Sequence, residues 1–77
     1  MYRGNEIRFD VVEHIATLSE SSGATKELNR ISYNGAAPKL DLRSWKVENN
    51  NKRMLKGLTL TNDEAKALRD ALNRIDL

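Results

Sequence analysis

Hydrophobic and polar residues alternate along much of the chain, which is the pattern of β-strands that bury one side. In residues 38–47, Leu40 and Leu42 point to one side of the expected strand, and that side can be buried. The other side carries the cations Lys39 and Arg43, the acid Asp41 and the indole of Trp45. We expect this second side to stay open to a partner that offers negative charge and flat rings.

Other segments also have the composition and period of strands. They are residues 7–19, residues 25–33 and residues 54–60. In the first of them the hydrophobic positions change sides at Val11 and Val12, which predicts a β-bulge. In the last of them Gly57 predicts either a bulge or a close approach by another part of the structure.

The segments between these strands contain residues that favour turns. Residues 19–24 are small and polar with a glycine, and Asn34-Gly35 is a strong signal for a hairpin. Pro38 suits the first position of a strand, where its missing N–H does least harm. Residues 48–53 are expected to form a polar loop.

A helix is expected at the C-terminal end of the chain. Thr61 and Glu64 have the spacing of a capping box, and the helical pattern continues to about Arg74. The apolar stripe of this helix consists of Ala65, Leu68, Ala71, Leu72 and Ile75.

These elements predict one α+β domain over residues 1–77, with a curved four-stranded antiparallel sheet followed by one helix (ββββα). One short helix cannot cover four curved strands, so apolar surface is left for a second copy, and a two-fold dimer is expected. We assign its interface to the helix residues Leu68, Leu72 and Ile75.

The composition excludes several classes of protein. There is no cysteine and only one histidine, which rules out disulfides and thiolate metal sites, and no cofactor is expected. No apolar run approaches the roughly 20 residues that span a bilayer, and the N-terminus lacks the hydrophobic segment of a signal peptide. We therefore expect a cytoplasmic protein. No nucleophile–base pair or glycine-rich phosphate loop is present, so we do not expect an enzyme.

Positive charge is concentrated in the middle of the chain. Residues 25–56 hold eight cations and three acids, whereas the segments 1–20 and 61–77 each carry an excess of acids. This asymmetry favours an anionic partner for the central strands, although lysine and arginine also form ordinary solvated surfaces.

Several stretches occur together in a characteristic order. They are Phe9-Asp-Val-Val-Glu-His-Ile, Ser19-Glu-Ser-Ser-Gly, Thr25-Lys-Glu-Leu-Asn, Pro38-Lys-Leu-Asp-Leu-Arg-Ser-Trp and Lys56-Gly-Leu-Thr-Leu-Thr. In this set the chain resembles, over about residues 8–75, the bacterial YdbC-like branch of the transcriptional positive-cofactor-four coactivator family. The resemblance implies a ββββα protomer, a dimer joined through helices and sheet edges, and single-stranded DNA lying across the concave sheets.

The resemblance also suggests which residues contact DNA. It implies a basic contact at Arg43 with an aromatic ring nearby at Trp45. It places a second stacking ring at Tyr33 and a lysine contact at Lys56. Because cations follow phosphates and rings stack on bases, the DNA-binding candidates are Lys26, Tyr33, Lys39, Arg43, Trp45 and Lys56. Such contacts predict little sequence preference. The resemblance implies a role as a transcription cofactor or regulator, and we expect a location at the nucleoid.

Other interpretations of the same residues stay open. Single-stranded RNA could use the same surface, or exposed strand edges could bind a protein by strand addition. Trp45 could instead belong to a core or a dimer interface, and Tyr33 could simply cap its hairpin. Arg43 could pair with Asp41 or Glu27 rather than with a phosphate.

Overall fold

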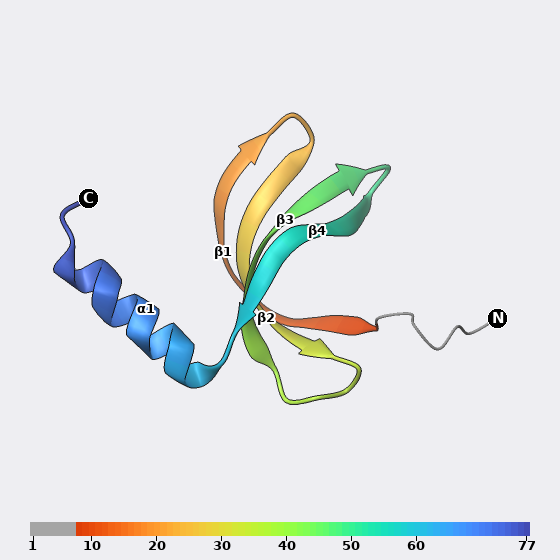
Figure 1. Ribbon diagram of the computed structural model, residues 1–77. Coiled ribbons are helices and arrows are strands. Elements are labelled where there is room, and N and C mark those ends of the chain that lie inside the picture. Colours follow the sequence, from red (N-terminus) through yellow and green to blue (C-terminus); the bar gives the residue numbers. More distant parts are fainter. Residues whose placement is uncertain (1–7) are drawn as a thin grey trace.

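The computed structural model describes residues 8–77, which form one open sheet and a C-terminal helix (Figure 1). The elements are β1 Phe9–Ser21, β2 Ala24–Tyr33, β3 Lys39–Glu48, β4 Asn51–Leu60 and α1 Asn62–Arg74. Each strand pairs antiparallel with the next, so the order across the sheet is β1-β2-β3-β4. The predicted ββββα arrangement is confirmed. No helix in the described part of the chain is long and apolar enough to cross a membrane.

Two-residue turns join β1 to β2 and β3 to β4. The first is Ser22-Gly23 and the second is Asn49-Asn50, and all four residues have positive φ. Turns of this kind have a twist that matches the strands they connect. The prediction of a polar loop over residues 48–53 is therefore wrong outside the turn, because Glu48 belongs to β3 and residues 51–53 belong to β4. Two asparagines that accept the left-handed region complete the turn, and residues 51–53 pair with β3.

Three irregularities in the pairing of β1 with β2 bend the sheet strongly. Each irregularity leaves one residue of β1 without a partner on β2, and these residues are Val12, Ile15 and Leu18. The first confirms the bulge predicted at Val11 and Val12. Bulges bend a strand and increase its twist, which accounts for the curvature in Figure 1. All three side chains are apolar and 40–56 % exposed on the edge strand.

Gly57 lets β4 approach β3 closely. A Cβ atom at this position would collide with the Cβ atom of Arg43 and lie 2.6 Å from the carbonyl oxygen of Leu42. The pairing of β3 with β4 also shifts here, between Arg43 and Trp45. Both predictions for a glycine in the middle of this strand, a bulge and a close approach, are confirmed.

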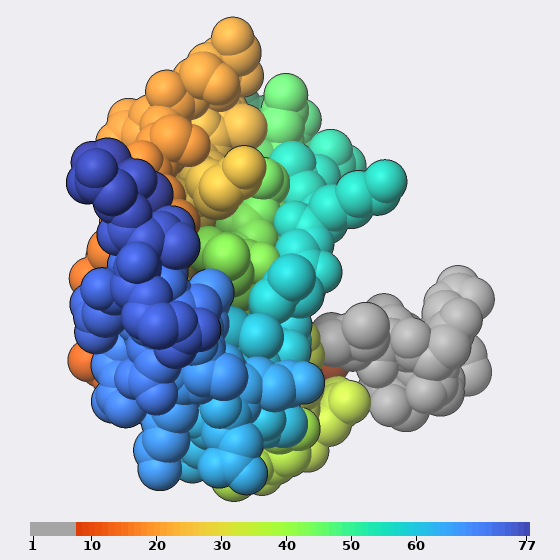
Figure 2. Space-filling view, turned by 60° about the vertical axis from the view of Figure 1, so that its left-hand side comes forward, coloured from red at the N-terminus to blue at the C-terminus, as the bar shows by residue number. Residues whose placement is uncertain are grey.

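The two sides of the sheet differ in chemistry and in burial. We call the side that carries Leu28, Leu40 and Leu42 the helix face, because α1 lies over these residues. A cavity of about 280 Å³ remains between α1 and the sheet, and no residue of α1 is buried. In Figure 2 the hairpin ends of the sheet extend beyond the helix. A single helix thus covers the helix face only in part.

The opposite side, which we call the aromatic face, holds the most buried residues of the described chain. They are Glu27, Asn29, Ile31, Asp41 and Trp45. The sequence analysis expected the reverse, with Leu40 and Leu42 buried and the side of Asp41 and Trp45 open. That expectation is wrong because the curved sheet closes over its own concave side, which alternation along one strand does not reveal.

The start of α1 has the predicted capping box. The hydroxyl of Thr61 accepts a hydrogen bond from the backbone N–H of Glu64 at 3.1 Å. The backbone N–H of Thr61 donates in turn to the Glu64 carboxylate at 2.8 Å. Two N–H groups that have no partner within the helix are thereby satisfied.

Replacing Thr61 by alanine is expected to lower the free energy of unfolding by about 1 kcal/mol, because the cap is lost while packing is unchanged. Thermal unfolding followed by circular dichroism measures the change. A Thr61→Ser variant keeps the hydroxyl, and its free energy of unfolding should remain within a few tenths of a kcal/mol of the wild-type value. An equal loss in both variants would show that the methyl group, rather than the cap, stabilises the protein.

Candidate functional site

The six residues predicted to bind DNA lie on two different faces of the sheet. Strand β2 pairs with β3 without irregularity, so its side chains alternate regularly. Lys26 lies on the helix face, as does Lys56, which lines a groove with it. The candidates on the aromatic face are Tyr33, Lys39, Arg43 and Trp45. The prediction placed all six on one surface, and the structure separates them.

On the aromatic face, the buried carboxylate of Asp41 holds Arg43 in place. Nε and Nη2 of Arg43 donate to the two oxygens of Asp41 at 2.6 and 2.7 Å. Nη1 donates to the carbonyl oxygen of Leu55 at 3.0 Å, and the Arg43 side chain is only 13 % exposed. All three nitrogens of the guanidinium are therefore engaged within the protomer. Of the pairings left open by the sequence, the one with Asp41 is confirmed.

Tyr33 and Thr59 complete the shell of donors around Asp41. The hydroxyls of Tyr33 and Thr59 donate to Asp41 Oδ2 at 2.6 and 3.1 Å. Burial by itself would raise the pKa of Asp41, but the hydrogen bonds from Arg43 and Tyr33 and the charge of Arg43 hold it below its ordinary value. Burial and this same carboxylate raise the pKa of Tyr33. The cluster is thus built around an ionised Asp41.

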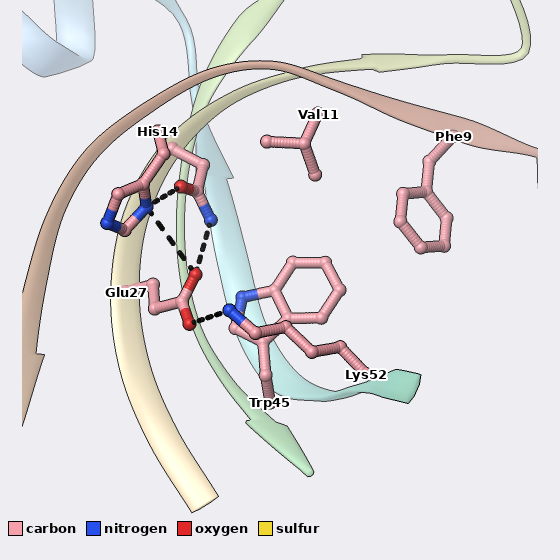
Figure 3. A pocket seen from close by; sticks show the side chains of 7 residues that line it. Phe9, Val11, His14, Glu27, Trp45 and Lys52 are labelled. Atoms are coloured by element: carbon pink, nitrogen blue, oxygen red, sulfur yellow. Dashed lines mark hydrogen bonds and ion pairs between the residues drawn. The ribbon is translucent and has the colours of Figure 1, made fainter. Parts of the chain in front are cut away.

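A second buried carboxylate, Glu27, organises the other end of the aromatic face (Figure 3). It accepts hydrogen bonds from Lys52 and Thr25 at 2.6 Å and from Asn29 at 3.2 Å. His14 Nδ1 lies 2.6 Å from Asn29 Oδ1 and 3.6 Å from Glu27 Oε1. Burial raises the pKa of Glu27, but these donors, led by Lys52, lower it overall.

The aromatic rings of this face pack on one another. The ring centroid of Phe9 lies 5.6 Å from that of Trp45 and 6.5 Å from that of Tyr33. Trp45 is 2 % exposed, so the expectation that its indole lies open to a partner is wrong. Phe9, which the sequence analysis did not single out, covers it, because the bent strand β1 carries Phe9 over the concave side. Tyr33 is half-buried and keeps part of its ring at the surface.

The helix face has the larger cluster of unpaired cations. A groove of about 400 Å³ is lined by Lys26, Ser44 and Lys56 together with Leu42, Arg43, Gly57 and Leu58. Lys46 pairs with Arg53 across β3 and β4 on the same face, next to this groove. We call Lys26, Lys46, Arg53 and Lys56 the basic groove. None of the four forms an ion pair with an acid of residues 8–77.

Sequence reasoning missed Lys46 and Arg53, although the hairpin could have indicated them. The two-residue turn at Asn49-Asn50 fixes the pairing of Lys46 with Arg53, and alternation from Lys26 and Ser44 then places all of them on one face. Lys39, at the start of β3, stands opposite Ile31 and is exposed on the aromatic face, outside this cluster. In the described part of the chain, no group of three or more acidic or histidine side chains could hold a metal ion.

Comparison with known proteins gives two findings. Residues 20–71 match the family described as Transcriptional Coactivator p15 (PC4). An uncharacterized protein of Treponema pallidum (strain Nichols) is 40% identical over 74 residues, which cover 95% of this chain and 85% of that protein. The matched range runs from the end of β1 into α1, so it includes the basic groove and the cluster around Asp41.

Proposed function

This chain belongs to the transcriptional coactivator p15 (PC4) family, and from that premise we propose that it is a homodimeric single-stranded DNA-binding protein. Membership of the family supports a DNA-binding, coactivator-like role in general terms, in a family whose members are typically not enzymes. Our proposal adds that the protein binds single-stranded DNA with little sequence preference, acts as a transcription cofactor or regulator, and is located at the nucleoid.

The basic groove is the observation that carries the proposal. Its four cations come from three neighbouring strands and lie on one face with no acid of residues 8–77 in an ion pair with them. Unpaired cations in a row attract a chain of phosphates, and their contacts release counterions from it. The guanidinium of Arg43 is bound to Asp41. We therefore propose that Arg43 holds β3 and β4 in position and is not a primary phosphate contact.

We propose that the single strand passes from the helix face to the aromatic face over the edge strand β4. Lys52 and Arg53 are consecutive on this edge and point to opposite faces, so a strand that leaves the basic groove at Arg53 next meets Lys52. On the aromatic face, Lys39 is available to a phosphate and the exposed part of the Tyr33 ring to a base. The ring of Trp45 is too deeply buried to serve as a stacking platform.

The homodimer is supported by apolar surface that the protomer leaves uncovered. Leu68 and Leu72 of α1, and the residue Ile75 that follows it, are 41–54 % exposed, as the predicted interface requires. The three bulge residues of β1 add a second row of apolar side chains, which the sequence analysis did not assign to an interface. Exposed apolar surface of this extent in so small a domain indicates an interface, and two-fold self-association is the common solution.

Removing charge from the basic groove tests the DNA-binding part of the proposal. If each protomer neutralises about four phosphates, the slope of log K against log salt should be about −3 for an oligo-dT strand. A Lys26→Ala/Lys56→Ala double variant should reduce the slope to about −1.4, since two contacts of about −0.7 each are lost. Fluorescence anisotropy of labelled oligo-dT over a series of KCl concentrations measures both slopes.

The matched control removes a cation from another part of the molecule. Lys66 lies on the exposed helix, and Lys66→Ala should keep the wild-type slope. A double variant that retains the full slope would exclude the basic groove as the phosphate path. Competition between oligo-dU and oligo-U strands of equal length distinguishes DNA from RNA, because these two strands differ only in the 2′-hydroxyl.

A further inference from the structure

A cavity of about 340 Å³ opens on the aromatic face next to the indole of Trp45 (Figure 3). Phe9 and Val11 of β1 form its apolar wall, while His14 and Lys52 border its polar end. Val11 and the side chains of His14 and Lys52 are each close to half exposed, so the cavity is reached from solvent between them.

The indole nitrogen of Trp45 is the only buried side-chain polar atom of residues 8–77 that has no hydrogen-bond partner. It is directed toward the polar end of the cavity in Figure 3. No neighbouring group of residues 8–77, Glu27 and Asn29 included, accepts a hydrogen bond from it. A buried N–H without a partner is costly, so an acceptor from outside the protomer would be held firmly.

The side chain of Lys52 controls access to this N–H. Its ammonium is bound to Glu27 while its chain passes beside the indole (Figure 3). The ammonium is half exposed, so a phosphate from solvent can reach it and replace Glu27 as its partner. Glu27 would keep the hydrogen bonds from Thr25 and Asn29, with His14 Nδ1 at 3.6 Å. A phosphate that attracts Lys52 would thus uncover the donor.

We propose that this cavity receives one nucleobase bearing a ring carbonyl, such as thymine, whose oxygen accepts a hydrogen bond from Trp45 Nε1. The base lies along the apolar wall of Phe9 and Val11, and its own phosphate draws Lys52 away from Glu27. Adenine has no carbonyl oxygen and is disfavoured here. The inference rests on the proposed path of the strand over β4, and it adds a preference at one nucleotide to otherwise unspecific binding. A free nucleotide offers the same chemistry.

The test compares oligo-dT with an oligonucleotide of equal length in which difluorotoluene replaces thymine. Difluorotoluene keeps the shape of thymine but is a poor acceptor. Wild-type protein should bind oligo-dT about five- to tenfold more tightly than the difluorotoluene oligonucleotide, which is the effect of one hydrogen bond. Val11→Phe fills the cavity and should bind both oligonucleotides equally, with an unchanged salt slope. Trp45→Phe, which removes the donor, should also lose the preference.

Equal binding of the two oligonucleotides by wild type, or a preference that survives in Val11→Phe, would overturn the inference. If no oligonucleotide binds at all, the proposed function fails. Titration with thymidine monophosphate then tests by itself whether the cavity binds a base. The chain has one tryptophan, so its fluorescence reports the cavity alone. Quenching in wild type but not in Val11→Phe supports the site, and absence of quenching excludes it.

Discussion

Replacing Asp41 by alanine is expected to lower the free energy of unfolding by about 3–5 kcal/mol, the usual cost of removing one partner from a buried ion pair. Asp41 is fully buried and accepts hydrogen bonds from Arg43, Tyr33 and Thr59. The variant would leave a guanidinium of low exposure without its counter-ion, and two hydroxyls without their acceptor. In a domain of this size that loss is comparable to the whole stability.

Urea unfolding at neutral pH measures the loss, with two controls. Asp41→Asn keeps the shape and one acceptor oxygen but removes the charge, so it should lie between alanine and wild type. Asp70→Ala removes an exposed carboxylate that pairs with Arg69 at 3.2 Å, and should cost less than about 1 kcal/mol. Similar losses in the Asp41 and Asp70 variants would show that the buried cluster does not stabilise the sheet.

The same cluster determines the response of the protein to acid. Asp41 and Glu27 have folded-state pKa values below their ordinary values of 3.8 and 4.5. Their contribution to stability is complete above those ordinary values and is lost as the pH falls through the lower folded-state values. We expect the urea midpoint to be nearly constant between about pH 7 and 5 and to fall steeply below about pH 4. Asp41→Asn should flatten this fall.

Most of the fold could be predicted from local sequence signals. The capping box at Thr61, the hairpin at Asn34-Gly35 and the change of sides at Val11 each depend on neighbouring residues, and each appears in the structure. The short turn at Asn49-Asn50 was missed because two asparagines in succession resemble an ordinary polar loop. Its consequence was large, since it extends β4 and places Arg53 beside Lys46.

The site could be predicted only in part, because alternation gives the side of a strand but not the burial of that side. Burial here depends on the bends of β1, and only the first of its three bulges was predicted from the sequence pattern. The same bends bring Phe9 over Trp45. The charge of Arg43 was visible in the sequence. Its hydrogen bonds to Asp41, two residues earlier on the same strand, depend on the side-chain conformations of both residues, which the sequence does not give.

Introducing a charge into the exposed apolar rows is expected to dissociate the proposed dimer. Leu72 of α1 and Ile15 of β1 are 46% and 40% exposed in the protomer, so a carboxylate at either position meets water when the protomer is alone. In an interface the same carboxylate would be buried without a partner. Leu72→Asp and Ile15→Asp should each weaken association by about 2–4 kcal/mol, the range of interface hot spots.

Sedimentation equilibrium measures the association constant, and Lys66→Asp on the exposed helix is the matched control that should leave it unchanged. The two interface variants differ in what they test. Loss of the dimer in Leu72→Asp alone would restrict the interface to the helix, whereas loss in both would include the bulged strand. A dimer of wild-type strength in both variants would contradict the proposed interface. Because two linked protomers bind one strand more tightly than either alone, the dissociated variants should also lose affinity for long oligo-dT while keeping it for short strands.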